Sequence, residues 1–264
     1  MQTSFVASAD AVMSLVETIR NLPRSGQPDL YIDLEGIKLS RYGSISIVTV
    51  YVQSKRHVYL VDVHTLGAAA FDTAAADGTT LRTILQSPHI VKAFFDVRND
   101  SDALHAHFGI KLQGIEDVQL MENASRSAGR RRYLHGLERC IESDSGASQP
   151  EKQAWKAAKL KGQKIFDPSK GGSYKAFNIR PMNADLETYC VNDVVFLPVL
   201  RKEYLARLDH TWRFKVAREA TNRVIESQSP GYDPHGASKS LGPWEKPLPD
   251  YADLFIDNFN DHWL

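Results

Sequence analysis

The chain has 264 residues, of which 42% are hydrophobic and 24% are charged, a composition typical of a globular protein rather than a disordered one. Lysine plus arginine equal aspartate plus glutamate at 32 each, so the bulk charge indicates no partner. No segment approaches the roughly 20 apolar residues that span a bilayer, and acids interrupt the first 20 residues, so we expect neither a membrane protein nor a secreted one. The only cysteines, Cys140 and Cys190, favour a reduced intracellular compartment (cytoplasm or nucleus) and argue against a structural zinc site.

The first half of the chain is rich in predicted strands. Residues 3–8 are expected to open a first strand, and residues 9–23 follow as an amphipathic helix that ends at a proline. Further strand-like segments lie at residues 29–36, 44–53, 57–63, 89–95 and 113–120. Tight connections between the first three of these predict an antiparallel meander, and short helices are expected at residues 79–87 and 100–109.

The second half of the chain is predicted to be helical. Helices are expected at residues 132–141, 151–161, 184–208 and 212–228. Residues 227–264 are rich in Pro, Gly and Ser without a period, which is typical of a surface wrap or a partly disordered segment. We therefore predict an α/β fold in which a mixed five-stranded sheet is flanked by helices, with one domain at residues 1–226 and a tail at 227–264. Ligand sites in such folds favour the ends of central strands.

Two acids stand on one predicted strand. Asp33 and Glu35 are two residues apart, so both side chains point to the same face of the strand, whereas Leu30, Ile32 and Leu34 pack the other face into a core. The plain alternative is a strand end at which both acids are solvated. Two like charges side by side destabilise each other, and burial adds to that cost, so the pair points to a bound cation.

A further acid is expected at the helix after the fourth core strand, where Asp96, Asn99, Asp100 and Asp102 compete. Asp100 lies four residues before Leu104 of the apolar stripe, so it shares the face that covers the sheet. Asp102 lies roughly 200° around the helix axis from Asp100 and is expected to point away. Alternatively, Asp100 only interacts favourably with the positive N-terminus of the helix.

The last acid lies within an apolar helix stripe. Asp193 recurs at helical spacing with Leu186, Cys190 and Leu197, and Tyr189 is one turn earlier on the same face. A charge in such a stripe needs a partner or a cation. The alternatives are a core tyrosine and an aspartate paired with an arginine.

Each of the four acids is expected to point inward with no equivalent basic residue beside it, so Asp33, Glu35, Asp100 and Asp193 would repel one another. Hard oxygen ligands of this kind suit Mg²⁺ or Mn²⁺. We therefore expect the four carboxylates to share a divalent-metal site.

At this point the sequence resembles a known family. The stretches "YIDLEG", "RNDSDAL" and "YCVND" resemble the three motifs of the DnaQ-like, or DEDD, superfamily of 3'-5' exonucleases. Motif I is Asp-x-Glu, the spacing of motif II favours Asp100, and motif III in the tyrosine branch is Tyr-x-x-x-Asp, matched by Tyr189 and Asp193. The resemblance covers roughly residues 3–210. Within the superfamily, the sequence is similar to RNase D, to Werner-type exonucleases and to the exonuclease 3'-5' domain-containing proteins. Its tail resembles the tails of fungal members of the last group.

The resemblance implies an RNase H-like fold and hydrolysis of phosphodiester bonds with two metal ions. Asp33, Glu35 and Asp193 would hold one ion, and Asp33 with Asp100 would hold the second. Tyr189 would orient the attacking water, because a free tyrosine with a pKa of about 10 is a weak base at neutral pH.

Contacts with nucleic acid are expected beside the metals and on a basic segment. The backbone of Leu34 and Gly36 would meet the terminal nucleotide, with glycine allowing close approach. Residues 126–175 hold twelve Lys or Arg and five Asp or Glu, with Tyr133 and Trp155 interleaved, a pattern that suits phosphates and stacked bases as well as a solvated helical face. The residues expected to bind nucleic acid are Leu34, Gly36, Arg98, Asn99, Arg130, Arg131, Arg132 and Lys156.

Three functions follow from these features. The first is a metal-dependent 3'-5' exonuclease that acts on the 3' end of RNA or DNA. The second is a catalytically silent adaptor that binds nucleic acid on the same fold, and the third is a phosphoesterase of short oligonucleotides. Because all four acids and Tyr189 are present, the sequence favours the first.

Overall fold

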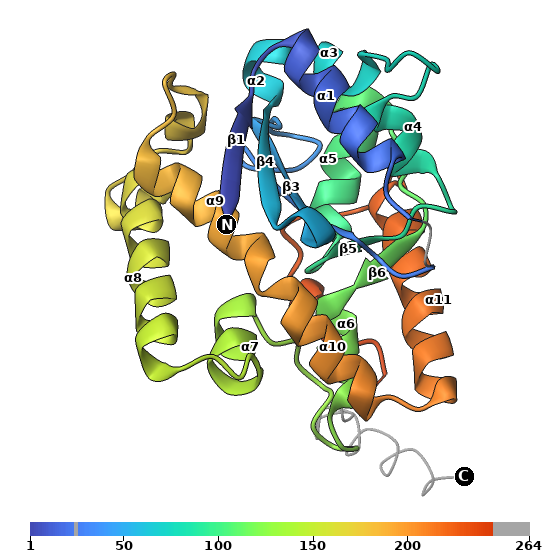
Figure 1. Ribbon diagram of the computed structural model, residues 1–264. Coiled ribbons are helices and arrows are strands. Elements are labelled where there is room, and N and C mark those ends of the chain that lie inside the picture. The colour runs from blue at the N-terminus through green and yellow to red at the C-terminus, as the bar shows by residue number, and fades with distance from the viewer. Residues whose placement is uncertain (24–25, 245–264) are drawn as a thin grey trace, which may run out of the picture.

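A six-stranded mixed sheet forms the centre of the molecule (Figure 1). The computed structural model describes residues 1–23 and 26–244, and its strands run in the order β1-β4-β3-β2-β5-β6. The strands are β1 (Gln2–Val6), β2 (Leu30–Glu35), β3 (Ile47–Val52), β4 (His57–Asp62), β5 (Lys92–Phe94) and β6 (Ile115–Asp117). The predicted meander is confirmed, because β2–β3 and β3–β4 are antiparallel, whereas the other three pairs are parallel. The sheet has one strand more than the predicted five, since β1 also joins it.

Helices cover both faces of this sheet. They are α1 (Ala9–Arg20), α2 (Val63–Leu66), α3 (Ala69–Asp72), α4 (Leu81–Gln86), α5 (Arg98–Phe108), α6 (Val118–Ser125), α7 (Leu137–Asp144), α8 (Gln149–Phe166), α9 (Ala184–Val195), α10 (Leu197–Arg207) and α11 (His210–Ser227). One hydrophobic core joins the sheet to α1, α3, α4 and α5, and a second joins the other face to α6–α10 and part of α11. Alternation along β2 puts Leu30, Ile32 and Leu34 in the first core and turns Tyr31 to the second.

Two predicted helix boundaries are wrong for identifiable reasons. The expected helix at 184–208 is two helices, and Pro198 lies in the first turn of α10, where its missing N–H needs no helical acceptor. The expected helix at 132–141 begins only after Gly136, because Tyr133 forms a β-bridge with Leu241 instead. In the same way, the strand expected at 113–120 ends at Asp117, whose carboxylate caps α6.

A buried lysine closes the helix α4. Lys92 has no exposed surface, and its Nζ donates hydrogen bonds to the carbonyls of Ile84 (3.1 Å) and Ser87 (2.8 Å) at the end of that helix. The carbonyl of Ile84 also accepts the N–H of Ser87, and the ammonium group gives both carbonyls a donor at the end of the helix. Burial lowers the pKa of Lys92 to about 7.

The segment after α11 lies along the body of the domain. The guanidinium of Arg41 donates hydrogen bonds to the carbonyls of Ser227 (2.7 Å) and Ser229 (2.9 Å), and Tyr232 donates its hydroxyl proton to Asn99 (2.9 Å). These contacts agree with a surface wrap for the part of the tail that is described. The boundary at residue 226 stays a prediction, and residues 245–264 lie outside the described residues.

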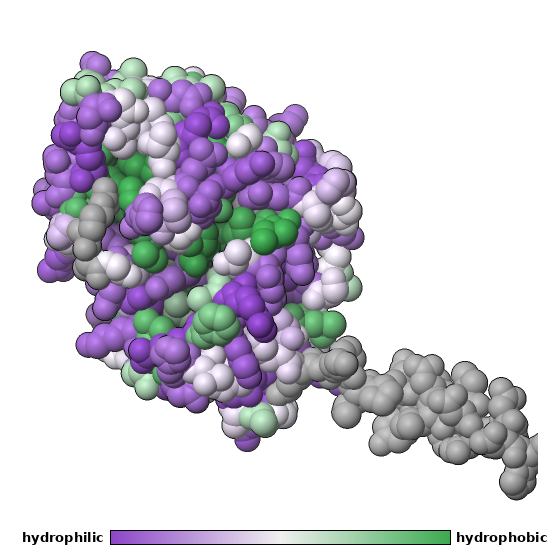
Figure 2. Space-filling view, turned by 90° about the vertical axis from the view of Figure 1, so that its right-hand side faces the viewer, coloured by the Kyte–Doolittle hydropathy of each residue, from purple (hydrophilic) through white to green (hydrophobic). Residues whose placement is uncertain are grey.

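The face of the molecule drawn in Figure 2 is mostly hydrophilic. Figure 2 shows the face on the right-hand side of Figure 1, where apolar residues gather in a recessed band between hydrophilic ones. Among the described residues, no helix combines the length and the apolar character that a membrane span requires. The intracellular compartment stays a prediction.

Candidate active site

The two acids of β2 point to the face that α8 and α9 cover. Leu34 between them is 2% exposed and packs in the first core, so alternation turns Asp33 and Glu35 to the second. The Oδ2 atom of Asp33 is buried and has no hydrogen-bond partner among the described residues. A buried carboxylate oxygen without a partner is costly, which marks a place for a proton or a cation.

Helix α9 brings a third carboxylate to this pair. Asp193 lies in the third turn of α9 and is 8% exposed. One carboxylate oxygen each from Asp33, Glu35 and Asp193 lie within 4.8 Å of one another. The sequence therefore predicted correctly that these three acids converge, from a strand and a helix that are about 160 residues apart in the chain.

Helix α5 supplies the fourth acid. Asp100 lies in the first turn of α5 and is 5% exposed, and the charge of Asp33 is its strongest charged neighbour. Asp102 points away, as predicted, and forms an ion pair with Arg41 (2.6 Å). Asp96 is also occupied, since it binds the guanidinium of Arg98 (2.6 Å). Of the competing acids, only Asp100 is thus directed at the cluster.

Burial raises the pKa of all four acids, and repulsion between carboxylates adds to the shifts of Asp33, Glu35 and Asp100. Burial, followed by the charge of Asp193, raises the pKa of Asp33 to about 8. Burial also raises the pKa of Glu35 and of Asp100 well above the usual range, and the charge of Asp33 adds to both shifts. Without a cation, the site therefore retains protons at neutral pH.

A basic residue lies beside the acids, which the sequence analysis did not expect. Lys159 of α8 places its Nζ 3.5 Å from Oδ1 of Asp193, so the expectation of four acids without a basic neighbour is wrong. The Lys159 ammonium also lies 4.9 Å from the centre of the Trp155 ring and 5.7 Å from that of Tyr189. The signal in the sequence was the helical spacing of Lys159 four residues after Trp155, which puts both on one face of α8.

Close packing of α8 on α9 fixes Tyr189. A side chain on Gly162 would place its Cβ 2.7 Å from Cβ of Tyr189, so only glycine lets the two helices approach this closely. Phe166 meets the Tyr189 ring edge to face at 5.0 Å. Burial, followed by the charge of Glu35, raises the pKa of Tyr189 well above its usual range, so this hydroxyl keeps its proton.

The residues beside the acids have specific packing roles. Gly36 is required by its own chain, because a Cβ there would lie 1.9 Å from the carbonyl oxygen of Ser44. Only the backbone of Leu34 is available to a ligand, since its side chain is in the core. Asn99 accepts hydrogen bonds from Tyr232 and from the Lys239 ammonium, so its side-chain oxygen already has partners.

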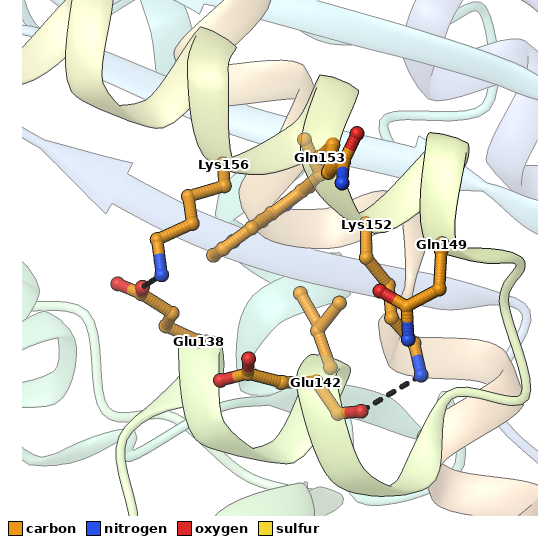
Figure 3. A pocket seen from close by; sticks show the side chains of 8 residues that line it. Glu138, Glu142, Gln149, Lys152, Gln153 and Lys156 are labelled. Carbon is orange, nitrogen blue, oxygen red and sulfur yellow. Dashed lines mark hydrogen bonds and ion pairs between the residues drawn. The ribbon is translucent and has the colours of Figure 1, made fainter.

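The basic residues singled out in the sequence do not line the acid cluster. Arg131 stacks on the Trp212 ring at 4.0 Å, and Arg132 lies over Tyr133 at 5.2 Å. Figure 3 shows Lys156 of α8 reaching across a small pocket to Glu138 of α7, with 3.2 Å between Nζ and Oε1. Both of these side chains are about half exposed, so the pair contributes little to stability.

The donor set fits a hard divalent cation. Its atoms are carboxylate oxygens, one of which is buried without a partner, and no cysteine or histidine is in the cluster of Asp33, Glu35 and Asp193 among the described residues. Oxygen-only sets of this kind suit Mg²⁺ or Mn²⁺. The predicted divalent-metal site is therefore supported by geometry and by ligand chemistry.

Comparisons with known proteins agree with this site. The mouse (Mus musculus) piRNA biogenesis protein EXD1 is 32% identical over 96 residues, which are 36% of this chain and 15% of EXD1, so the chain matches only a small part of that relative. Trypanosoma brucei RNase D in complex with RNA U12 has a TM-score of 0.68 at 19% identity, with 97% of this chain and 78% of RNase D covered. Brucella melitensis NrnC with bound Mg²⁺ has a TM-score of 0.56 at 18% identity, with 90% and 100% covered.

These structural similarities show a shared fold. The sequence model of a 3'-5' exonuclease family matches residues 4–208, which is more than three quarters of the chain, and the match includes all four acids and Tyr189. The resemblance seen in the three motifs is thereby confirmed, and the chain belongs to the family of DnaQ-like 3'-5' exonucleases.

Proposed function

We propose that this protein removes nucleotides from the 3' end of nucleic acid by metal-dependent hydrolysis of the phosphodiester bond. The observation that carries the proposal is the convergence of Asp33, Glu35 and Asp193 within 4.8 Å, beside the buried Asp100. Such a cluster is costly without cations, which supports a catalytic rather than a structural role.

Two ions, Mg²⁺ or Mn²⁺, fit the four acids. Asp33, Glu35 and Asp193 would hold one ion, and Asp33 with Asp100 would hold the other. When bound, such a pair lowers the pKa of water and stabilises charge on the attacking and leaving oxygens. The Mg²⁺ in Brucella melitensis NrnC, which shares the fold, supports this choice of metal.

Tyr189 would orient the attacking water rather than take its proton. Its raised pKa keeps the phenol neutral, so the hydroxyl is a hydrogen-bond donor near Asp193. Lys159 would partly balance the carboxylate charge and favour a phosphate group at the site, since its ammonium lies 3.5 Å from Asp193.

Nucleic acid is the proposed substrate. The backbone of Leu34 and Gly36 would contact the terminal nucleotide, and Arg98 and Asn99 would lie beside it at the start of α5. The basic segment that includes Lys156 and residues 130–132 would contact phosphates further along the strand. The RNA bound to Trypanosoma brucei RNase D makes RNA the first substrate to test.

A labelled oligonucleotide assay tests the proposal. A 5'-labelled RNA and a DNA of the same sequence are incubated with Mg²⁺ or Mn²⁺, with the Asp33→Asn variant as the control. A ladder with one-nucleotide steps that the variant does not produce is expected. An intact label together with a gel shift would instead indicate the silent adaptor, and cleavage restricted to the shortest substrates would indicate an oligonucleotide phosphoesterase.

A further inference from the structure

A large cavity lies away from the acid cluster, and the chain segments that line it are at the lower end of the ribbon in Figure 1. It has a volume of about 730 Å³ and is formed by the segment after α6, the start of α7 and the last turn of α10. The size suits a ligand rather than a few waters, because pockets for small molecules typically have roughly 300–1,000 Å³.

Arginines dominate the lining of this cavity. Arg126, Arg130, Arg132, Arg139 and Arg207 all face it, and no carboxylate lines it within residues 1–23 and 26–244. Guanidinium groups gathered around one cavity repel each other unless anions offset their charge. Planar guanidinium groups bind phosphate through paired hydrogen bonds, which makes arginine the usual choice for this ligand.

Two of the five arginines have structural partners. Arg126 pairs with Glu122 (3.1 Å) and donates to the carbonyl of Tyr133 (2.8 Å), which shapes the segment after α6. Arg207 is held by Asp144 (3.0 Å) and Glu203 (2.8 Å). These two arginines form a fixed wall of the cavity.

The other three arginines are available to a ligand. In the part of the chain that the structure describes, Arg130, Arg132 and Arg139 form no ion pair, and Nε of Arg132 is buried without an acceptor. The neighbouring Tyr133 is 53% exposed and stacks against Arg132 at 5.2 Å. An exposed ring beside unpaired arginines suits a base and its phosphate together.

We infer that this cavity is a second binding site, which holds phosphate groups of the nucleic-acid strand upstream of the reacting 3' end. The inference rests on the proposed function and adds a length dependence to it. Asp193 and Arg207 are 14 residues apart along helices α9 and α10. At a rise of 1.5 Å per helical residue, their backbones are separated by at most about 21 Å. A strand that rises about 3.4 Å per nucleotide covers this distance in about six nucleotides.

The test compares the binding of a 12-nucleotide and a 4-nucleotide RNA, since only the longer strand reaches the cavity. Binding is measured in the Asp33→Asn background with EDTA, so the result does not depend on hydrolysis. The length advantage is the ratio of the affinity for the 12-nucleotide RNA to that for the 4-nucleotide RNA, and it should fall at least tenfold in the Arg130→Glu/Arg139→Glu variant. The slope of log affinity against log salt concentration for the longer RNA should become shallower by about 1.4, which corresponds to two phosphate contacts. The Arg130→Gln/Arg139→Gln variant should lower the length advantage and the salt slope as well, but by a smaller amount. Thermal melting curves of each variant check that it is folded.

The matched control is Lys111→Glu/Arg218→Glu, which makes the same change in charge at two exposed residues outside the cavity. An unchanged length advantage in the cavity variant, or an equal loss in the control, would overturn the inference.

Titration with inorganic phosphate alone distinguishes the phosphate groups of a nucleic-acid strand from free phosphate as the ligand of the cavity. Micromolar binding of free phosphate that the cavity variant abolishes, together with an unchanged length advantage, would assign the cavity to a free anion instead. The protein could show no exonuclease activity while its length advantage still depends on the cavity arginines. That combination would refute the proposed catalysis but support the second binding site.

Discussion

Replacing Asp33 by asparagine should abolish hydrolysis and stabilise the metal-free protein. Asp33 retains a proton up to about pH 8 in the folded state, whereas an unfolded aspartate releases it near pH 4. Between these values the folded state binds more protons than the unfolded one, so the stability of the wild type falls as the pH rises. Asparagine binds no proton and escapes this penalty.

The magnitude follows from proton linkage. One proton of difference is worth about 1.4 kcal/mol per pH unit, so the stability advantage of Asp33→Asn should grow by up to about 3 kcal/mol between pH 5 and pH 7. Urea unfolding in EDTA at the two pH values measures this difference. Mg²⁺ should make the wild type the more stable of the two proteins, because only the wild type binds it. At a Mg²⁺ concentration of 100 times the Kd for the wild-type site, this binding adds about 2.7 kcal/mol to the unfolding free energy.

The control is Asp185→Asn, which removes an exposed acid from the first turn of α9. This variant should leave the exonuclease rate unchanged and show no pH-dependent gain in stability. The reasoning about Asp33 is refuted if its stability advantage does not change with pH. Retention of more than about a tenth of the wild-type rate, roughly 1.4 kcal/mol of barrier, would refute its role as a metal ligand.

Other substitutions separate the remaining roles. Asp100→Ala should remove activity without loss of stability. Asp102→Ala removes the carboxylate partner of Arg41, whose guanidinium then keeps only backbone carbonyls as acceptors, and should cost about 3–5 kcal/mol of unfolding free energy while activity persists at low temperature. Equal activity losses would contradict the assignment. Tyr189→Phe keeps the packing and should lower the rate about 10–1000-fold with an unchanged melting temperature, so a nearly normal rate would show a core role only. Lys92 loses its proton near pH 7 in the folded state but near 10.5 when unfolded, so stability should rise with pH between these values by at most about 1.4 kcal/mol per unit. Lys92→Met should abolish that rise in urea unfolding at pH 7.5 and 9.5, and an identical rise in the variant would exclude Lys92 as its source.

Much of the active site was predictable because it depends on periodicity within single elements. Alternation along β2 put Asp33 and Glu35 on one face, and helical spacing put Asp193 under Tyr189. The mixed sheet with its meander followed from short connections between apolar segments. These features are local, so residue types and their spacing determine them.

Helix ends were less predictable because they depend on competing partners. The residues before α7 could continue the helical pattern, but pairing of Tyr133 with Leu241 satisfies their backbone instead. The partner lies more than 100 residues away, so no local signal reports it.

Residue types and their spacing were enough to predict which acids converge, which tyrosine lies beside them, and which faces of their elements they occupy. The neighbours of these residues came from the packing of distant elements, which places Lys159 beside Asp193, pairs Asp102 with Arg41, and brings arginines from α7, α10 and the segment after α6 around one cavity. The physical reason is that spacing fixes the direction of a side chain relative to its own helix or strand. Which charges meet across elements depends on how those elements pack, and that packing is decided by the whole core.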